Sequence, residues 1–145
     1  MRASDAMTHP ASAPVDLVHL ADEGGHFIVR IVGEPSPLTE HGSLRAEVLA
    51  SASFVDARLD LFFLLPRYLD LWEEALSDLV PGRSAGIDSG RGLSFELRRH
   101  ENGWVSVSLH DPDRITLGLG FRPKGDWVQE HLDRLEQVRR FWADA

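Results

Sequence analysis

Apolar and polar residues alternate with a period of two along the first part of the chain, a pattern typical of strands with one buried and one wet face. In the segment 43–54, for example, the even-numbered residues are apolar, whereas Arg45 and Glu47 fall on odd positions. The pattern begins at Val15. It predicts four strands, at residues 15–21, 26–33, 43–54 and 56–65.

The period changes to that of a helix at Pro66, a residue that is well tolerated in a first helical turn. The helix is predicted to end near Val80, because Pro81 and Gly82 follow. Its apolar stripe consists of Leu69, Trp72, Leu76 and Leu79. Its opposite side carries four acids, Asp70, Glu73, Glu74 and Asp78.

Like charges one turn apart destabilise a helix by about 0.2–0.5 kcal/mol per pair. Each large apolar side chain that becomes buried contributes about 1.5–3 kcal/mol in the opposite direction. The apolar stripe is therefore expected to hold this helix against the sheet, in spite of its acidic side.

The second half of the chain predicts a β-hairpin followed by a third strand. Apolar residues alternate at 93–97 and again at 105–109, and Asn102 and Gly103 between them favour a type I′ turn. The alternation resumes at 115–121, so the three strands form a meander. The Gly- and Ser-rich segment before the hairpin is interpreted as a loop, with a short strand at 85–87 as the alternative.

Helical periodicity returns at the C-terminal end of the chain. Asp126 is the predicted N-cap, and Gln129 at the third helical position completes a capping-box arrangement. The apolar face of this helix consists of Val128, Leu132, Leu135, Val138 and Trp142.

This order of elements predicts an α+β fold: an antiparallel sheet or open β-sandwich of about seven strands, with two amphipathic helices. A chain of 145 residues, 43% of them hydrophobic, matches one domain of ordinary size. We assign residues 15–145 to that single α+β domain. Residues 1–14 mix Ala, Ser, Pro and Thr, cannot bury apolar area, and are predicted to be a disordered N-terminal arm.

Charge and composition restrict the class of partner. Acidic residues outnumber basic ones by 23 to 15, and the net charge of −8 disfavours nucleic acid and favours a basic protein partner. The chain has no cysteine, which excludes disulfides and thiolate chemistry. It shows neither the apolar region of a signal peptide nor a run of about 18 apolar residues, so we expect a cytoplasmic protein without a membrane partner.

No set of residues predicts catalysis or cofactor binding. The seven histidines lack the H-x-x-x-H spacing of a zinc site, and the glycines of 82–92 do not form a phosphate-binding loop. Residues 110–113 place His110 beside two carboxylates, which could form a general base or a cation site, although Asp-Pro-Asp is also ordinary turn chemistry. We therefore predict no catalytic residue, no cofactor and no metal.

The acidic side of the first helix is the candidate binding surface. Its carboxylates are expected to face water, unpaired with the chain's own arginines, and to dock a cationic partner through complementary charge. An aromatic residue after the hairpin turn is interpreted as an anchor. The alternatives are a solvated face that keeps the protein soluble and a cross-strand packing role for the aromatic residue. The predicted partner-binding residues are Asp70, Glu73, Glu74, Asp78 and Trp104.

Four segments carry a family resemblance: VDLVHLAD, HFIVRIVG, LRAEVLASASFVDARLDLFFLLPRYLDLWEEALSDLVPG and DPDRITLGLGFRPKGDWVQEHLDRLEQVRRFW. Together they resemble a family of small actinobacterial proteins of unknown function, over roughly residues 15–142. More distantly, the order of elements and the L-x-x-W-x-x-x-L helix at Leu69, Trp72 and Leu76 are similar to immunity proteins of the WapI type. This second resemblance implies an antitoxin-like binding role, and no functional residue carries over from it.

These observations predict a non-enzymatic binding protein, an immunity-type inhibitor of a basic, toxin-like protein. A homo-oligomeric scaffold or regulatory subunit is the alternative, which would use a free sheet edge or an apolar sheet face. An enzymatic or small-molecule-binding domain is the third class. It would require His110 and Asp111 to meet His19 or His26 in a cleft.

Overall fold

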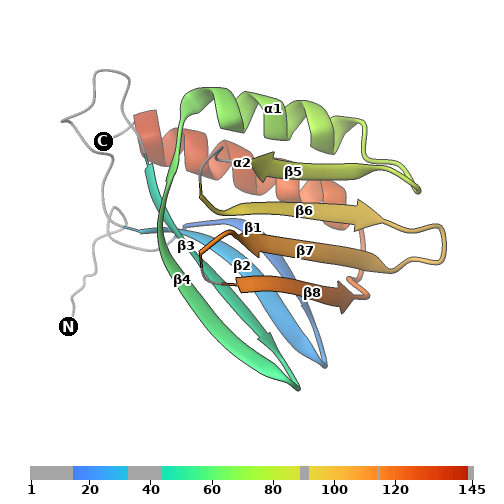
Figure 1. Ribbon diagram of the computed structural model, residues 1–145. Helices are drawn as coiled ribbons and strands as arrows, with labels where there is room; N and C mark the ends of the chain where they lie inside the picture. Colours follow the sequence, from blue (N-terminus) through green and yellow to red (C-terminus); the bar gives the residue numbers. More distant parts are fainter. Residues whose placement is uncertain (1–14, 33–43, 89–91, 114, 144–145) are drawn as a thin grey trace, which may run out of the picture.

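Two four-stranded antiparallel sheets and two helices make up the fold (Figure 1). The computed structural model describes residues 15–32, 44–88, 92–113 and 115–143, so the arm predicted for residues 1–14 lies outside the described residues. The first sheet has the strands β1 Val15–Asp22, β2 Gly25–Val32, β3 Leu44–Ala52 and β4 Val55–Leu64, in that order. The second has β5 Ser84–Asp88, β6 Ser94–Arg99, β7 Val105–Asp111 and β8 Ile115–Phe121, again in order. The helices are α1, Pro66–Ser77, and α2, Trp127–Ala143.

The predicted α+β class is confirmed, but the strand count differs from the prediction, and the single sheet that was one of the two predicted arrangements does not form. Within the described residues, eight strands make two sheets, rather than about seven strands. The additional strand is β5, at the place of the short strand that was the alternative to a loop; it pairs with β6 and buries Ala85 and Ile87. Gly86 lies so near β6 that a Cβ there would sit 2.3 Å from the Phe95 carbonyl oxygen. The close packing requires a glycine here, and Gly86 made the sequence of this strand resemble that of a loop.

The two sheets pack face to face around an aromatic cluster. Phe27 of β2 and Phe95 of β6 have ring centroids 5.6 Å apart, so the first sheet contacts the second at this point. Trp72 of α1 packs edge-on to Phe95, also at 5.6 Å. Figure 1 shows both helices on the same side of the sandwich, where α1 packs against β5 and α2 against β1.

The hairpin predicted at Asn102 and Gly103 is present, but its turn type differs. The Gly103 N–H donates to the His100 carbonyl at 3.2 Å, and the His100 N–H donates to the Trp104 carbonyl at 2.9 Å. Residues 101–103 therefore form a three-residue loop, in which a type I turn is followed by a left-handed residue. Gly103 takes that position, with φ of +90°. The type I′ prediction was wrong because it placed the glycine inside a two-residue loop.

Both helices start where their capping residues predict. α1 begins at Pro66 and ends at Ser77, three residues before the predicted Val80. At α2 the Gln129 N–H donates to Asp126 Oδ1 at 3.1 Å, as expected of an N-cap. The Gln129 side chain donates to an aspartate further along the helix, so only this half of the capping box forms. Within the described ranges, no helix has the length and apolar character needed to cross a bilayer.

Candidate functional site

The apolar stripe of α1 is buried, as predicted. Leu69, Trp72 and Leu76 face the core, and Leu79 beyond the helix end is also buried. Burial of this stripe turns the opposite side of α1, which carries the four predicted carboxylates, away from the core.

Two of the four carboxylates pair with an arginine of the same chain. Arg139 of α2 contacts Asp70 at 2.8 Å and Glu73 at 3.0 Å, and it also contacts Glu136 at 3.2 Å. Partial burial alone would lower the pKa of Arg139, but the bonds to these carboxylates raise it. The expectation of unpaired carboxylates is therefore wrong for Asp70 and Glu73. The reason is that α1 and α2 pack side by side, which the sequence does not reveal.

Replacing Arg139 with glutamine is expected to change the free energy of unfolding by less than about 1 kcal/mol. Asp70 is 76% exposed and Glu73 is 47% exposed, so water screens both ion pairs. Urea unfolding of the variant measures the change. A loss well above 1 kcal/mol would mean that Arg139 holds the two helices together rather than neutralising their surface.

The remaining two carboxylates lie on the outward side of α1. Glu74 and Asp78 are exposed and make no ion pair with any residue that the structure describes. Leu71 lies on the same side, because positions i, i+3 and i+7 share one helix face, and it is 59% exposed. We call Leu71, Glu74 and Asp78 the α1 ridge. It combines an exposed apolar side chain with two free negative charges.

The structure does not bring Trp104 together with the acids of α1. Trp104 is 40% exposed and lies on the second sheet, where Arg122 stacks over its ring at 5.0 Å. Its ring also covers Gly120, since a Cβ on that glycine would lie 3.7 Å from the indole. Trp104 thus belongs to a different surface from the predicted one, and it has the cross-strand contacts that were its alternative role.

That surface is a cleft of about 920 Å³ between the two sheets. One wall is formed by the β1–β2 and β3–β4 turns, and the other by Trp104 and the end of β8. Phe54, at the β3–β4 turn, lines the first wall and is 69% exposed. Figure 1 shows the tips of these hairpins reaching past β8 at the open end of the sandwich.

The residues considered for catalysis do not converge. His110 bonds to the Thr116 hydroxyl at 2.7 Å, on the outer face of the second sheet. The Asp111 carboxylate accepts the Asp113 N–H at 3.0 Å, which is turn chemistry. His19 instead contacts Asp16 on the first sheet. Among the residues described, no group of three or more metal-ligating side chains comes together.

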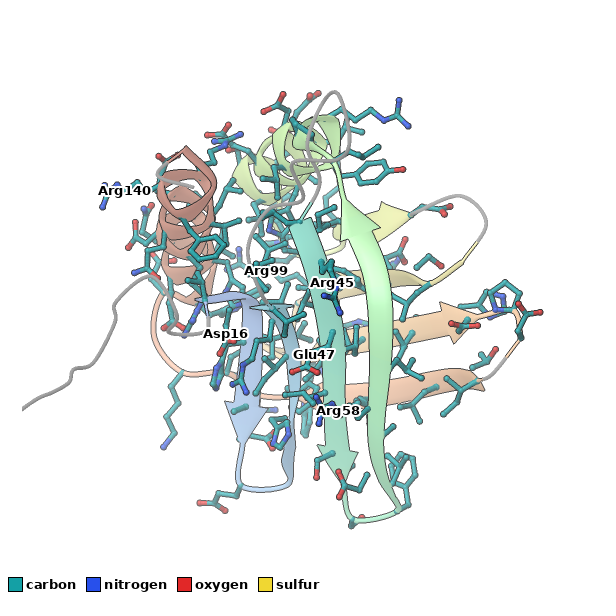
Figure 2. The ribbon with its side chains drawn as sticks, turned by 90° about the vertical axis from the view of Figure 1, so that its left-hand side faces the viewer. Asp16, Arg45, Glu47, Arg58, Arg99 and Arg140 are labelled. Atoms are coloured by element: carbon teal, nitrogen blue, oxygen red, sulfur yellow. The ribbon has the colours of Figure 1, made fainter. Side chains whose placement is uncertain are left out.

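The outer face of the first sheet carries two internal ion pairs. Arg30 contacts Asp16 at 2.8 Å, and Arg58 contacts Glu47 at 2.8 Å. Figure 2 shows Glu47 beside Arg58 on neighbouring strands. Burial alone would raise the pKa of Asp16, but its hydrogen bonds to Arg30 and to a histidine lower it. The charges of each pair satisfy one another, so neither pair offers free charge to a partner.

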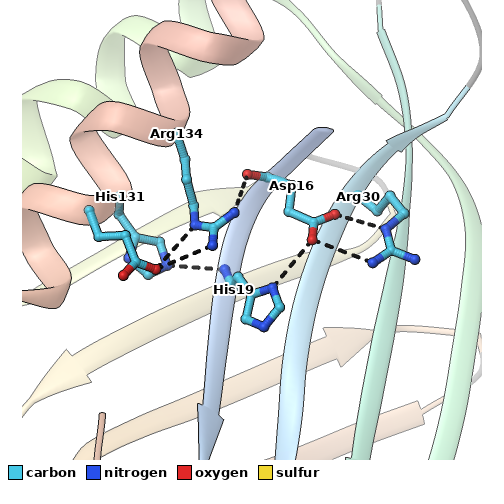
Figure 3. Close-up of polar contacts among 6 residues, drawn as sticks. Asp16, His19, Arg30, His131 and Arg134 are labelled. Carbon is cyan, nitrogen blue, oxygen red and sulfur yellow. Dashed lines mark hydrogen bonds and ion pairs between the residues drawn. The ribbon is translucent and has the colours of Figure 1, made fainter. Parts of the chain in front are cut away.

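His131 of α2 is fully buried against β1 (Figure 3). Its Nδ1 bonds to the Trp127 carbonyl at 2.6 Å, and its Nε2 accepts the His19 N–H at 3.1 Å. One ring nitrogen donates and the other accepts, so the imidazole is neutral. Arg134 donates to the Asp16 carbonyl at 3.5 Å. The two α2 side chains therefore satisfy outward backbone groups of β1, which is a structural role.

Three residues of these surfaces were missed by the sequence interpretation. Leu71 had a usable signal, because it is an apolar residue among acids on the polar side of the helical wheel. Phe54 had none, because the pattern placed it at the end of the predicted strand 43–54, among its apolar residues, whereas it lies in the β3–β4 turn. The pairing of Arg139 also had none, because the sequence does not show that α2 lies beside α1.

Residues 15–143 match a family of unknown function, DUF5959. Neither a curated protein nor a solved structure matches the chain. The predicted resemblance to a family of unknown function, over about residues 15–142, is thereby confirmed. The actinobacterial source and the similarity to WapI-type immunity proteins stay predictions.

Proposed function

We propose that this chain, which belongs to the family of unknown function DUF5959, is a non-enzymatic binding protein for a basic protein partner. The docking surface is the α1 ridge of Leu71, Glu74 and Asp78, with Asp70 and Glu73 at its border. An immunity-type inhibitor of a toxin-like protein is the class that we propose, since a basic toxin carries the complementary charge.

One observation carries the proposal: α1 exposes a large apolar side chain beside two carboxylates that make no ion pair with any described residue. Leu71 is more than half exposed, and Glu74 and Asp78 follow it one and two turns further along the same helix face. Interfaces commonly combine an apolar anchor with surrounding polar groups, and complementary charge accelerates association. The ridge offers both features to a cationic partner.

The position of these charges in the helix strengthens the argument. Glu74 lies in the last turn of α1 and Asp78 is its C-cap, where the helix dipole disfavours negative charge. The first turn has no acidic residue and the last turn has no basic residue, so at neither end do side-chain charges stabilise the helix dipole. Glu74 also faces Asp70 and Asp78 one turn away on either side. A cationic partner would relieve this repulsion, which folding alone leaves in place.

The double charge reversal Glu74→Lys/Asp78→Lys is expected to abolish partner binding while slightly stabilising the fold. It removes two unfavourable dipole interactions and turns the repulsion between position 74 and Asp70 into attraction, while the two lysines repel each other as Glu74 and Asp78 did. The expected gain is about 0.5–2 kcal/mol in the free energy of unfolding. Crosslinking capture from the native host, followed by titration with the purified captured protein, measures binding. Urea unfolding measures stability.

The matched control is Asp56→Lys/Asp113→Lys, two exposed residues on the β4 strand and the β7–β8 turn. Each reversal adds two positive charges, so either double variant changes the net charge from −8 to −4. We expect the control to retain the partner, and binding by the wild type to weaken as salt rises. Loss of binding in both variants, or in neither, would reject the α1 ridge as the docking surface.

The alternative function, a homo-oligomeric scaffold or regulatory subunit, predicts self-association. Light scattering at micromolar concentration separates the two functions, because the α1 ridge carries like charges that oppose pairing with a second copy.

A further inference from the structure

The strands at the ends of the two sheets are covered to different extents. α2 covers the outward side of β1, where its side chains bond to the His19 N–H and the Asp16 carbonyl. α1 packs against β5, the first strand of the second sheet. β8 is the last strand of that sheet, and among the described residues it pairs with β7 alone.

The backbone groups that β8 turns outward can be identified from one contact. The Arg122 N–H donates to Asp22 Oδ2 at 3.1 Å, so this amide points away from β7. Alternate residues of a strand direct their N–H and C=O groups to the same side. Thr116, Gly118 and Gly120 therefore present their backbone groups to the open side of β8.

Gly118 is a glycine that the fold itself does not require. At Gly25 and Gly86 a Cβ would lie 1.9 Å and 2.3 Å from a backbone oxygen of the neighbouring strand. At Gly118 a Cβ would meet no atom within 4 Å, and its backbone has no left-handed φ. A glycine in a strand weakens that strand, and it often marks a place where another backbone approaches closely.

The open side of β8 borders the cleft described above. The lining of the cleft includes the buried side chains of Leu119 and Phe121, together with Gly118 and Gly120. Two exposed aromatic side chains, Phe54 and Trp104, stand on its opposite walls. The cleft thus places apolar surface beside a row of unpaired backbone donors and acceptors.

The charges at this end of β8 differ from those of the protein as a whole. Arg122 and Lys124 line the cleft on the β8 side and make no ion pair within the described part of the chain, although Arg122 stacks on Trp104. On the facing turn, Asp22 is engaged by the N–H groups of Gly24 and Arg122, and Glu23 also lines the cleft. The two cations are on the β8 side and the acids on the opposite turn, so a carboxylate of a ligand is favoured next to Arg122 and Lys124.

We propose that β8 receives an extended, acidic segment of a partner protein, which pairs with it as a fifth strand of the second sheet. An extended polypeptide backbone offers donors and acceptors at the spacing of a strand edge. An apolar side chain of this segment lies between Phe54 and Trp104, and a carboxylate lies beside Arg122 and Lys124. This site is separate from the α1 ridge and does not depend on the function proposed for it.

Hydrogen–deuterium exchange of the free protein tests the first step. The amides of Gly118 and Gly120 are expected to exchange fast, whereas those of Leu117 and Leu119, which point to β7, exchange slowly. Slow exchange at both glycines in a monomer would overturn the proposal, because the edge would already be occupied.

The variant Gly118→Pro tests the pairing itself. Proline lacks an N–H, and at this position the N–H is not used by β7, so an edge strand tolerates the change. Gly118→Ala is the matched control, since it keeps the N–H. The near-UV circular dichroism of both variants is expected to equal that of the wild type.

The probes are seven-residue peptides from a random phage-displayed library, selected on the wild type and counter-selected on Gly118→Pro. We expect enrichment of peptides that alternate apolar and polar residues and carry Asp or Glu near one end. Synthetic copies should protect the Gly118 and Gly120 amides from exchange. They should bind Gly118→Pro at least about tenfold more weakly than the wild type or Gly118→Ala. The variant Arg122→Gln/Lys124→Gln should weaken them about three- to tenfold.

Several results would overturn the proposal. Failure of the library to enrich any peptide would do so, as would peptides that bind Gly118→Pro and Gly118→Ala equally. Self-association of the wild type that Gly118→Pro abolishes would assign the edge to a second copy of the chain instead. None of these results would bear on the α1 ridge, because its charge-reversal variants leave β8 unchanged.

Discussion

Replacing Trp72 with alanine is expected to lower the free energy of unfolding by about 3–5 kcal/mol, the largest effect of any single substitution that we predict. The indole is fully buried and packs edge-on to Phe95 at the junction of α1 and the two sheets. Its removal leaves a cavity where three elements meet, and neighbouring side chains can fill it only in part. Urea unfolding, with tertiary structure followed by near-UV circular dichroism, measures the loss.

Trp72→Phe separates packing from hydrogen bonding at the same position. The indole Nε1 is buried and has no hydrogen-bond partner among the residues that the structure describes, and an unmade bond of this kind costs about 1–3 kcal/mol. Phenylalanine keeps much of the ring and removes the unpaired donor, so we expect a loss below about 1.5 kcal/mol.

Leu71→Ala serves as the control for Trp72→Ala on the same helix. Leu71 is mostly exposed, and its truncation should change stability by less than about 0.5 kcal/mol. If Trp72→Ala were equally mild, α1 would not be anchored by its apolar stripe, and the outward direction of the α1 ridge would lose its basis.

The second large effect is expected at His131. Replacement by leucine should lower the free energy of unfolding by about 2–4 kcal/mol. The substitution removes two hydrogen bonds at once, and it leaves the part-buried His19 N–H without its acceptor. A neutral apolar side chain of similar size cannot replace either bond.

His131 should also make stability depend on pH. Burial lowers its pKa from the ordinary value near 6.5, and Arg134 and His19 act in the same direction. The hydrogen bond to Trp127 and the charge of Glu130 act against this, with smaller effect. The folded-state pKa thus lies below the unfolded-state pKa, so the unfolded chain binds more protons in the window between them. The stabilisation is complete above about pH 6.5 and declines as the pH falls, by up to about 1.4 kcal/mol per pH unit.

Urea unfolding at several pH values between 7.5 and 5 measures this dependence. In His131→Gln the slope is expected to flatten, since glutamine does not titrate but can still donate and accept hydrogen bonds. His110→Gln is the matched control, because His110 is exposed and should leave the slope unchanged. Equal slopes in the wild type and in His131→Gln would show that another group controls the pH dependence.

Much of the fold could be predicted from periodicity alone. Strands with one buried face show it as an alternation of apolar and polar residues, as β7 does from Val105 to Leu109, and the stripe of Leu69, Trp72 and Leu76 has the spacing of a helix face. The segment of β5 was interpreted as a loop, with a short strand only as the alternative, because its central residue is Gly86, which lets another strand approach closely. Local patterns do not show which elements pair, so a single sheet and an open sandwich both remained possible.

The candidate site was predicted only in part, for the same physical reason. Helical spacing predicts which residues of α1 face outward, and it does so correctly for Glu74 and Asp78. Helical spacing does not predict where α2 lies, and it is the position of α2 that brings Arg139 to Asp70 and Glu73. Nor does it reveal that Trp104 faces Gly120 and Arg122, because that neighbourhood is created by strand register.

The contact between His19 and His131 joins residues 112 positions apart, and it has a consequence for how the protein is made. The first strand leaves the ribosome more than 100 residues before the helix that covers its outer edge. Until α2 is made, the nascent first sheet has an uncovered edge strand, which can pair with other chains. Truncation ahead of α2 would make that transient state permanent, so shortened chains should accumulate in inclusion bodies.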